Sequence, residues 1–303
     1  MRGKPFHRRV DGVLLLDKPT GLSSNAALQR ARRAYGALRA GHTGTLDPMA
    51  SGLLPVCFGE ATKLSGELLD AGKGYLADIH LGVRTSTGDA EGEILESRGC
   101  SVSQEQLLAA IQAFRGPIQQ TPPMHSALKR NGQPLYALAR QGRAVDREAR
   151  SVVIHVIDFI EFDGTVAKVA VECSKGTYIR VLAEDIGSAL GCGAHLSALR
   201  RTRVGNFLLQ DAIPLHKIED EAYAPKRDSW LLSLDLLAGN RPRVELSTED
   251  ALRFGCGQTV SPVLSPDGTV RVYALDGRFL GLGRLTESVL SVKRGMQPPA
   301  APE

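Results

Sequence analysis

Long apolar runs are missing from this sequence. Residues 13–16 form the longest apolar run near the N-terminus, whereas a membrane-spanning helix needs about 20 apolar residues and the core of a signal peptide at least about seven. The run is too short for either, and it follows a basic stretch over residues 1–9. We therefore expect a protein that stays in the cytosol.

Paired cysteines, sequence repeats and a nucleotide-binding phosphate loop are also missing. Residues 59–63 read Gly-Glu-Ala-Thr-Lys and lack the Gly-Lys-Ser/Thr of a Walker-type loop. No Cys-x-x-Cys pair occurs, and the single Cys-x-x-His at Cys192 has no second half. We expect free thiols and no metal. The five scattered cysteines are Cys57, Cys100, Cys173, Cys192 and Cys256.

The net charge of +4 and the pI of 8.8 are too small to identify a nucleic-acid-binding protein. The distribution of the basic residues is more informative, because they fall in three clusters. Such clusters suit a polyanion, although a single basic helix face is more often simply solvated. The clusters are Arg30, Arg32, Arg33 and Arg39; then Lys129, Arg130, Arg140, Arg143, Arg147 and Arg150; then Arg200, Arg201 and Arg203.

The chain of 303 residues, with 43% hydrophobic and 23% charged residues, is typical of a soluble globular protein with one large and one small domain. Hydrophobic periodicity and turn residues predict strands mixed with helices and joined by hairpins, which indicates an α+β fold with a mostly antiparallel sheet. The predicted strands cover about 11–16, 75–81, 152–162 and 165–173, and the predicted helices cover about 25–35, 104–114 and 177–190.

The pattern loosens between residues 206 and 243, where acidic residues and prolines accumulate. We place a domain boundary late in this stretch, with one domain over 10–240 and a second over 244–295. A short helix that begins after Ser247, followed by strands around Gly-containing turns, indicates a small β-rich second domain. Residues 296–303 are expected to form a disordered tail.

The most distinctive segment is the loop at residues 41–63, which contains four glycines and two prolines. It begins Gly-His-Thr-Gly-Thr-Leu-Asp-Pro, and the Asp-Pro step holds Asp47 on a stiff turn. A rigid loop of this kind is a usual place for a catalytic side chain. The plainer alternative is an Asx-turn with a solvated carboxylate.

This loop resembles the signature of the TruB-type tRNA pseudouridine synthases, and the resemblance covers roughly residues 10–295. The other family motifs follow in order: residues 15–24, residues 72–75 (Gly-Lys-Gly-Tyr), residues 173–180 (Cys-Ser-Lys-Gly-Thr-Tyr-Ile-Arg) and residues 198–205. Residues 245–295 resemble the small RNA-binding β-barrel called PUA. The resemblance implies that uridine in the T-loop of tRNA, at position 55, is converted to pseudouridine.

The resemblance also assigns roles in a reaction that breaks the bond between ribose C1′ and uracil N1 and rejoins the base through C5. It makes Asp47 the catalytic carboxylate, either as nucleophile or as the base that removes a ribose proton. Arg180 would pair with Asp47 and keep it ionised at neutral pH, because a nearby cation lowers the pKa of a carboxylate. Tyr75 would stack on the base and serve proton transfer at C5. No redox step occurs, so no cofactor is expected.

Five more residues are implied to contact the substrate, which must be flipped out of the RNA. His42 matches the residue that helps to displace the target nucleotide, and Leu199 and Tyr178 would form apolar walls. Ordinary packing would explain both walls almost as well. Lys18 and Lys63 are expected to have structural roles or to contact phosphates.

The basic insertion at residues 122–150 resembles the RNA-gripping thumb of the bacterial enzymes. We expect Lys129, Arg130, Arg140 and Arg143 to contact the RNA backbone of the tRNA T-arm. This favours a guide-independent enzyme, and we expect a monomer with no obligatory protein partner. The alternatives are a guide-RNA-dependent pseudouridine synthase subunit and an RNA chaperone that folds tRNA without chemistry.

Overall fold

The structure is a computed structural model, and it describes residues 8–297 except 127, 131, 140, 144 and 262–266. For residues 129, 130, 134 and 136 it describes the backbone alone. The predicted tail begins too early: the Met296 amide donates to the Leu280 carbonyl at 2.9 Å, and the Gln297 amide donates to Glu60 at 2.8 Å. The remainder of that tail, residues 298–303, lies outside the described residues.

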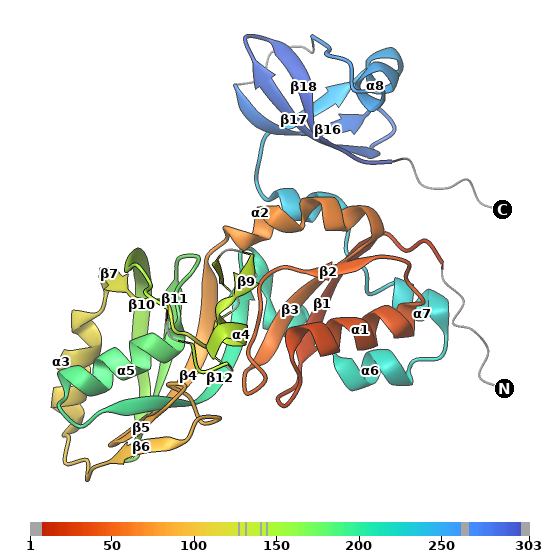
Figure 1. The fold of residues 1–303 in the computed structure, drawn as a ribbon. Coiled ribbons are helices and arrows are strands. Elements are labelled where there is room, and N and C mark those ends of the chain that lie inside the picture. The colour runs from red at the N-terminus through yellow and green to blue at the C-terminus, as the bar shows by residue number, and fades with distance from the viewer. Residues whose placement is uncertain are drawn as a thin grey trace.

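Within the described residues, a mixed and mostly antiparallel sheet of ten strands forms the centre of the molecule, as the α+β prediction required (Figure 1). Eight strands follow the order β14-β1-β3-β12-β4-β11-β10-β7, while β13 pairs with β12 and β2 with β3. Only the β1–β14 and β3–β12 pairs among these are parallel. The strands are β1 (Gly12–Lys18), β2 (Ala40–His42), β3 (Ser51–Phe58), β4 (Lys73–Leu81), β7 (Gly116–Gln120), β10 (Arg150–Phe162), β11 (Val166–Cys173), β12 (Ala194–Val204), β13 (Phe207–Leu208) and β14 (Ile213–Pro214).

Strand β1 is buried on both faces, which explains its continuous apolar sequence. Leu14 and Leu16 face helix α1 (Ser24–Tyr35), whereas Val13 and Leu15 belong to a core on the opposite face. Helix α1 begins where predicted, with the Ser23 hydroxyl accepting the Ala26 amide at 3.1 Å. The other helices of this part are α2 (Ser65–Leu69), α3 (Gln104–Ala113), α5 (Ile179–Ala189), α6 (Leu215–Asp220), α7 (Ala224–Asp228) and the 3-10 turns η1 (Gly59–Leu64), η2 (Leu209–Asp211) and η3 (Leu234–Ala238).

Helices α3 and α5 pack on the other half of the sheet, where they share one core with β4, β10, β11 and β12. Helix α3 begins with a capping box, in which Ser103 and Gln106 exchange side-chain and backbone hydrogen bonds. A small hairpin, β5 (Val83–Thr85) and β6 (Ile94–Ser97), follows β4. Its loop contacts the first turn of α5, where Arg180 donates to the Thr87 carbonyl, so the segment at residues 86–91 lies beside the Asp47 loop.

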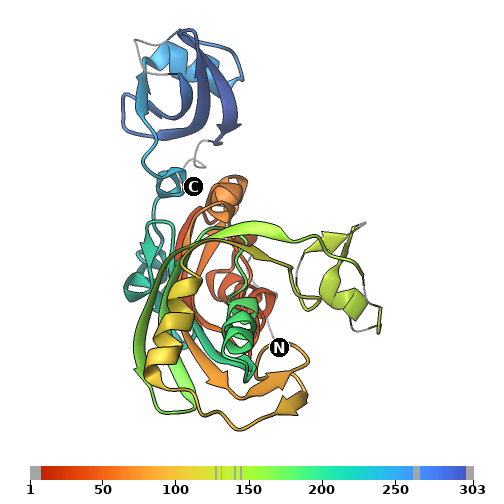
Figure 2. The ribbon, with the colours of Figure 1, turned by 90° about the vertical axis from the view of Figure 1, so that its left-hand side faces the viewer.

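Residues 122–150, which we call the arm, connect β7 to β10. The arm contains β8 (Lys129–Arg130), β9 (Gln133–Pro134) and α4 (Leu135–Ala139). Figure 2 shows it in yellow-green, extending away from the main sheet. The arm is therefore an insertion between the paired strands β7 and β10 and extends outside the core.

The C-terminal strands form a separate four-stranded sheet, which lies beyond α2 in Figure 1. It comprises β15 (Arg243–Leu246), β16 (Gly268–Ala274), β17 (Phe279–Thr286) and β18 (Val289–Gly295), with α8 (Thr248–Gly255) packed on it. Leu282 of this sheet shares a core with Leu68 and Leu237. The ion pair between Arg241 and Glu67 adds a polar contact at this junction. The two sheets are therefore joined by packed apolar side chains.

Candidate functional site

The Asp47 loop is fixed to the start of α1 by a buried hydroxyl. Ser24, which is 1% exposed, accepts the Leu46 amide at 2.7 Å and donates to the Leu46 carbonyl at 2.9 Å. The Gly21 amide donates to the Pro48 carbonyl at 2.8 Å. Both backbone groups of Leu46 and the carbonyl of Pro48 are therefore held, and Asp47 lies between them on a rigid turn.

Arg180 connects Asp47 to a second carboxylate. Its guanidinium lies 3.2 Å from Asp47 Oδ2 and 3.2 Å from Asp89 Oδ2, and it also donates to the carbonyls of Thr87 and His125. The Arg180 side chain is 5% exposed and that of Asp89 3%, whereas that of Asp47 is 37% exposed. A buried arginine with this many partners is fixed in place, and the carboxylate open to solvent is Asp47.

Sequence reasoning missed Asp89. Its carboxylate accepts hydrogen bonds from the Thr87 hydroxyl at 2.5 Å and the Glu91 amide at 3.1 Å, so it is held independently of Arg180. The available signal was the turn-like run Thr-Ser-Thr-Gly-Asp at residues 85–89, shortly after the Tyr75 strand. Hydroxyl residues around a Gly-Asp step predict a tight turn held by its own hydrogen bonds, but they do not indicate which distant residue the aspartate contacts.

Arg180 pairs with Asp47 and lowers its pKa, as expected, but burial has the larger effect. Burial raises the pKa of the Asp47 carboxyl above its usual value; Arg180 lowers it, Asp89 raises it and Lys18 lowers it, and the net direction is upward. Arg180 thus limits the rise rather than producing a low pKa. Because partial burial disfavours its charged form, this carboxylate is a stronger base and nucleophile than one fully in water, which suits either chemical role left open above.

Asp47 lies at the junction of two cavities, which share Thr45, Leu46, Asp47, Ser126 and Arg180. One cavity, of about 510 Å³, is lined by Tyr75, Tyr178, Ile179, Leu199 and further residues including Arg201. The other, of about 580 Å³, is more polar and includes His42, Asn25, Asp89, Glu91 and His125. The first has the aromatic and aliphatic walls that a flat base needs, and the second has groups suited to a ribose or phosphate.

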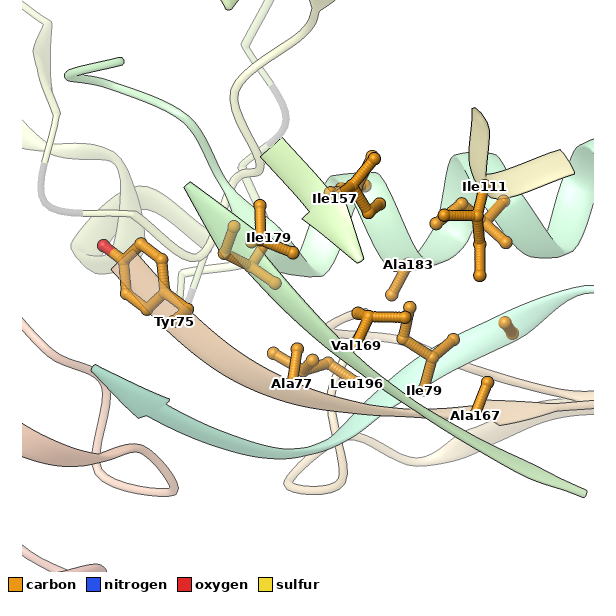
Figure 3. Close-up of a cluster of buried hydrophobic side chains, with 14 of the residues drawn as sticks. Tyr75, Ala77, Ile79, Ile111, Ile157, Ala167, Val169, Ile179, Ala183 and Leu196 are labelled. Atoms are coloured by element: carbon orange, nitrogen blue, oxygen red, sulfur yellow. The ribbon is translucent and has the colours of Figure 1, made fainter. Parts of the chain in front are cut away.

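Tyr75, on β4, lies at the edge of the apolar core shared with α3 and α5. Its phenolic oxygen points away from the other labelled core residues (Figure 3). The phenol is hydrogen-bonded by Arg201, and burial raises its pKa. Arg201 is 1% exposed and donates to the carbonyls of Leu53, Gly44 and Thr45 at 2.7, 3.1 and 3.4 Å. One buried guanidinium therefore holds both the Tyr75 phenol and the start of the Asp47 loop.

Three other residues that were predicted to contact the substrate line one or the other of the two cavities. Leu199 and Tyr178 line the cavity with Tyr75, and His42 lines the polar cavity. The Nδ1 atom of His42 is buried and has no hydrogen-bond partner within the described residues, and burial lowers the pKa of the ring. The ring therefore lines the polar cavity in a largely neutral form.

Neither predicted lysine lines a cavity beside Asp47. Lys18 is fully buried and donates to the carbonyls of Pro19 and Leu22 at 2.9 and 2.6 Å, and burial lowers its pKa to about 8. Lys63 pairs with Glu60 at 2.6 Å and donates to the Gly295 carbonyl at 3.3 Å. Lys18 thus braces the turn before α1, and Lys63 contributes to the junction with the C-terminal sheet.

Two of the three basic clusters are largely engaged within the protein. Arg30 pairs with Glu219, Arg200 with Asp17 and Arg203 with Glu172, while Arg201 is buried. These two clusters therefore offer fewer unpaired cations to a polyanion than their sequences suggest. In the arm, Arg143 is exposed. Arg140 lies outside the described residues, as do the side chains of Lys129 and Arg130.

Among the described residues, no group of three or more His, Cys, Asp or Glu side chains is placed to hold a metal ion. Within the same residues no helix is long and apolar enough to cross a membrane.

Comparison with known proteins agrees with this fold and site. Residues 32–179 match the TruB family pseudouridylate synthase N-terminal domain, residues 180–237 the tRNA pseudouridylate synthase B C-terminal domain, and residues 242–296 the pseudouridine synthase II TruB C-terminal domain. These matches define the chain as a pseudouridine synthase. The chain belongs to the TruB family.

Relatives named tRNA pseudouridine synthase B align over nearly the whole chain. The Burkholderia mallei (strain ATCC 23344) protein is 51% identical over 97% of this chain and 96% of its own, and the Dechloromonas aromatica (strain RCB) protein is 53% identical over 93% and 94%. Among solved structures, the one titled Crystal Structure of a Cbf5-Nop10-Gar1 Complex has 28% identity and a TM-score of 0.69, covering 90% of this chain and 78% of that chain.

Proposed function

We propose that this protein converts the uridine at position 55 in the T-loop of tRNA to pseudouridine, without a guide RNA or a protein partner. The observation that carries the proposal is the pair of ion contacts from Arg180 to Asp47 and Asp89 at the junction of two cavities. The names of the relatives at about half identity supply the substrate class.

The reaction moves one bond and one proton. Uridine enters the cavity beside Tyr75 after it is flipped from the T-loop, a step that costs a few kcal/mol. Asp47 initiates cleavage of the bond between C1′ and N1 by one of two routes. It either attacks C1′, forming a bond that breaks when C5 bonds to C1′, or removes a ribose proton that is returned to the ribose afterwards. The free uracil turns, C1′ bonds to C5, and the proton leaves C5 while N1 gains one. The product is therefore an isomer of the substrate.

The residues around Asp47 serve these steps in different ways. Arg180 holds the carboxylate in place and offsets its charge, while Tyr75 presents a flat face and a phenolic oxygen to the base. Leu199 and Tyr178 narrow the cavity and exclude water, which retains the detached uracil. His42 lines the polar cavity, where it can help to displace the target nucleotide from the T-loop.

The test is incubation of the purified protein with an unmodified tRNA transcript, followed by mapping of pseudouridine at single-nucleotide resolution. We expect product at position 55 alone, and none in a matched transcript with cytidine at that position. Product that forms only after a guide RNA or a partner protein is added would favour the guide-dependent alternative. Tight binding without product would favour the RNA chaperone.

A further inference from the structure

A buried amide side chain links the base of the arm to the Asp47 site. Gln120 is the last residue of β7 before the arm and is 1% exposed. Its Oε1 accepts the Tyr178 amide at 3.0 Å, and its Nε2 donates to the Tyr178 carbonyl at 3.2 Å. The side chain therefore pairs with both backbone groups of one residue, as a neighbouring strand would.

Tyr178 is the residue whose placement matters most at this point. It is the N-cap of α5, and its side chain makes no capping hydrogen bond. The first turn of α5 then carries Arg180, which pairs with Asp47. Because a trans peptide fixes the distance between consecutive Cα atoms, the Tyr178 backbone sets where the Arg180 side chain begins. Gln120 thus acts on Arg180 through two residues of backbone.

The other end of the arm contacts the same turn. Arg150, the first residue of β10, is the cross-strand partner of Gln120. Its guanidinium donates to the Gly176 carbonyl and lies 5.2 Å from the centre of the Tyr178 ring. Both ends of the arm therefore contact the turn at residues 176–178. Gln120 binds the backbone of Tyr178, and Arg150 binds the Gly176 carbonyl and lies over the Tyr178 ring.

We propose that Gln120 and Arg150 are positioning residues that hold Tyr178 and Arg180 in register with Asp47 and couple the arm to the catalytic site. A third contact also joins the arm to the site: Arg180 donates to the carbonyl of His125, a residue of the arm, at 2.6 Å. RNA held by the arm then stabilises the arrangement of Arg180 that the reaction uses. This inference rests on the role proposed for Asp47.

The test compares Gln120→Met with Gln119→Met. Methionine keeps the length of glutamine but makes neither hydrogen bond, and Gln119 is exposed on the same strand, so the control carries the same change without the clamp. We expect Gln120→Met to lower the single-turnover rate on saturating tRNA about ten-fold or more, because small displacements of catalytic groups are costly. The dissociation constant should change less than two-fold, roughly, since no phosphate contact is lost.

The pH profile separates positioning from a general loss of structure. Arg180 lowers the pKa of Asp47, so a displaced Arg180 lets that pKa rise further, and the acid limb of the rate should move to higher pH in Gln120→Met only. Gln120→Glu supplies a rescue: protonated glutamate can accept and donate as glutamine does, so its activity relative to wild type should increase as the pH falls. An unchanged rate and acid limb in Gln120→Met would overturn the proposal.

A readout that needs no catalysis keeps this inference distinct from the proposed function. The Tyr178 amide should exchange with solvent deuterium faster in Gln120→Met than in wild type or in Gln119→Met, because its acceptor is gone. If wild type makes no pseudouridine, the proposed function fails, and unchanged exchange at Tyr178 would still overturn the clamp. Faster exchange with an unchanged rate would show a clamp without influence on catalysis, which also contradicts the proposal.

Discussion

Gly52 lies so close to Arg201 that a Cβ at position 52 would meet the Arg201 carbonyl oxygen at 2.3 Å. The two residues are paired in parallel where β3 meets β12, and Gly52 has a φ of +102°. Arg201 in turn holds the Tyr75 phenol and the carbonyls of Gly44 and Thr45. Because position 52 has no side chain, the backbones of β3 and β12 can approach closely enough for the Arg201 guanidinium to contact both the Asp47 loop and Tyr75.

Gly52→Ala is expected to lower the free energy of unfolding by about 2 kcal/mol or more, because alanine adds both a backbone clash and an unfavourable φ. Urea denaturation measures this. Gly66→Ala is the matched control: Gly66 lies in α2 without a positive φ, and no described heavy atom lies within 4 Å of its Cβ position. Equal stability of the two variants would show that the β3–β12 contact tolerates a side chain.

Asp47→Asn should stabilise the protein at neutral pH. The Asp47 pKa is raised in the folded state, so the folded protein keeps the proton to higher pH than the unfolded chain, and the ionised carboxylate costs stability above that folded pKa. Asparagine removes the cost. The advantage over wild type should shrink as the pH falls toward the ordinary aspartate value of 3.8. Urea titrations at several pH values measure it, and a less stable variant at pH 7.5 would contradict the net upward shift.

Lys18→Met should remove a rise of stability with pH. The Lys18 pKa is lowered from 10.5 to about 8 in the folded state, so between these values the unfolded chain binds more protons and the unfolding free energy increases with pH. Comparing wild type with Lys18→Met between pH 7 and 9 isolates this group from other titrating residues. Parallel curves for the two proteins would show that Lys18 stays charged when folded.

The arm is expected to bind RNA mainly through phosphates. Replacing Lys129, Arg130, Arg140 and Arg143 with Gln should flatten the slope of log affinity against log salt by about two units, because about three of these cations are expected to meet phosphates and each contact contributes roughly 0.7 to 0.9. The rate on saturating tRNA should change little. A quadruple change of Arg30, Arg200, Arg203 and Arg253 to Gln is a charge-matched control, since each pairs with an acidic residue of the protein. An unaltered salt slope in the arm variant would place the RNA contacts elsewhere.

Much of the fold could be predicted because its signals are local. The Ser23 cap, the Ser103 and Gln106 capping box, and the hairpin turn at Asp163 lie next to the elements that they define. The structure also brings Asp47, Tyr75 and Arg180 together around joined cavities. That grouping could be expected only through the resemblance to a family, because the three residues come from distant segments.

The remainder depends on packing between distant residues, which local patterns do not encode. Arg201 belongs to a basic run that suggested phosphate binding, yet the fold buries it against carbonyl groups. Asp89 belongs to a turn with no visible partner until α5 brings Arg180 beside it. Lys63 follows the signature loop closely, but η1 directs it to Glu60 and the C-terminal sheet. In each case tertiary contacts decide the role of the side chain.

The central claim is that the Asp47 carboxylate initiates the reaction, and Asp47→Asn tests it most directly. Single-turnover formation of pseudouridine should be followed with the variant in excess over a tRNA transcript, after its binding has been measured by filter retention. We expect wild-type affinity and no detectable product, because the amide keeps the shape of the side chain but loses its charge. Appreciable product from Asp47→Asn at saturating concentration would contradict the account.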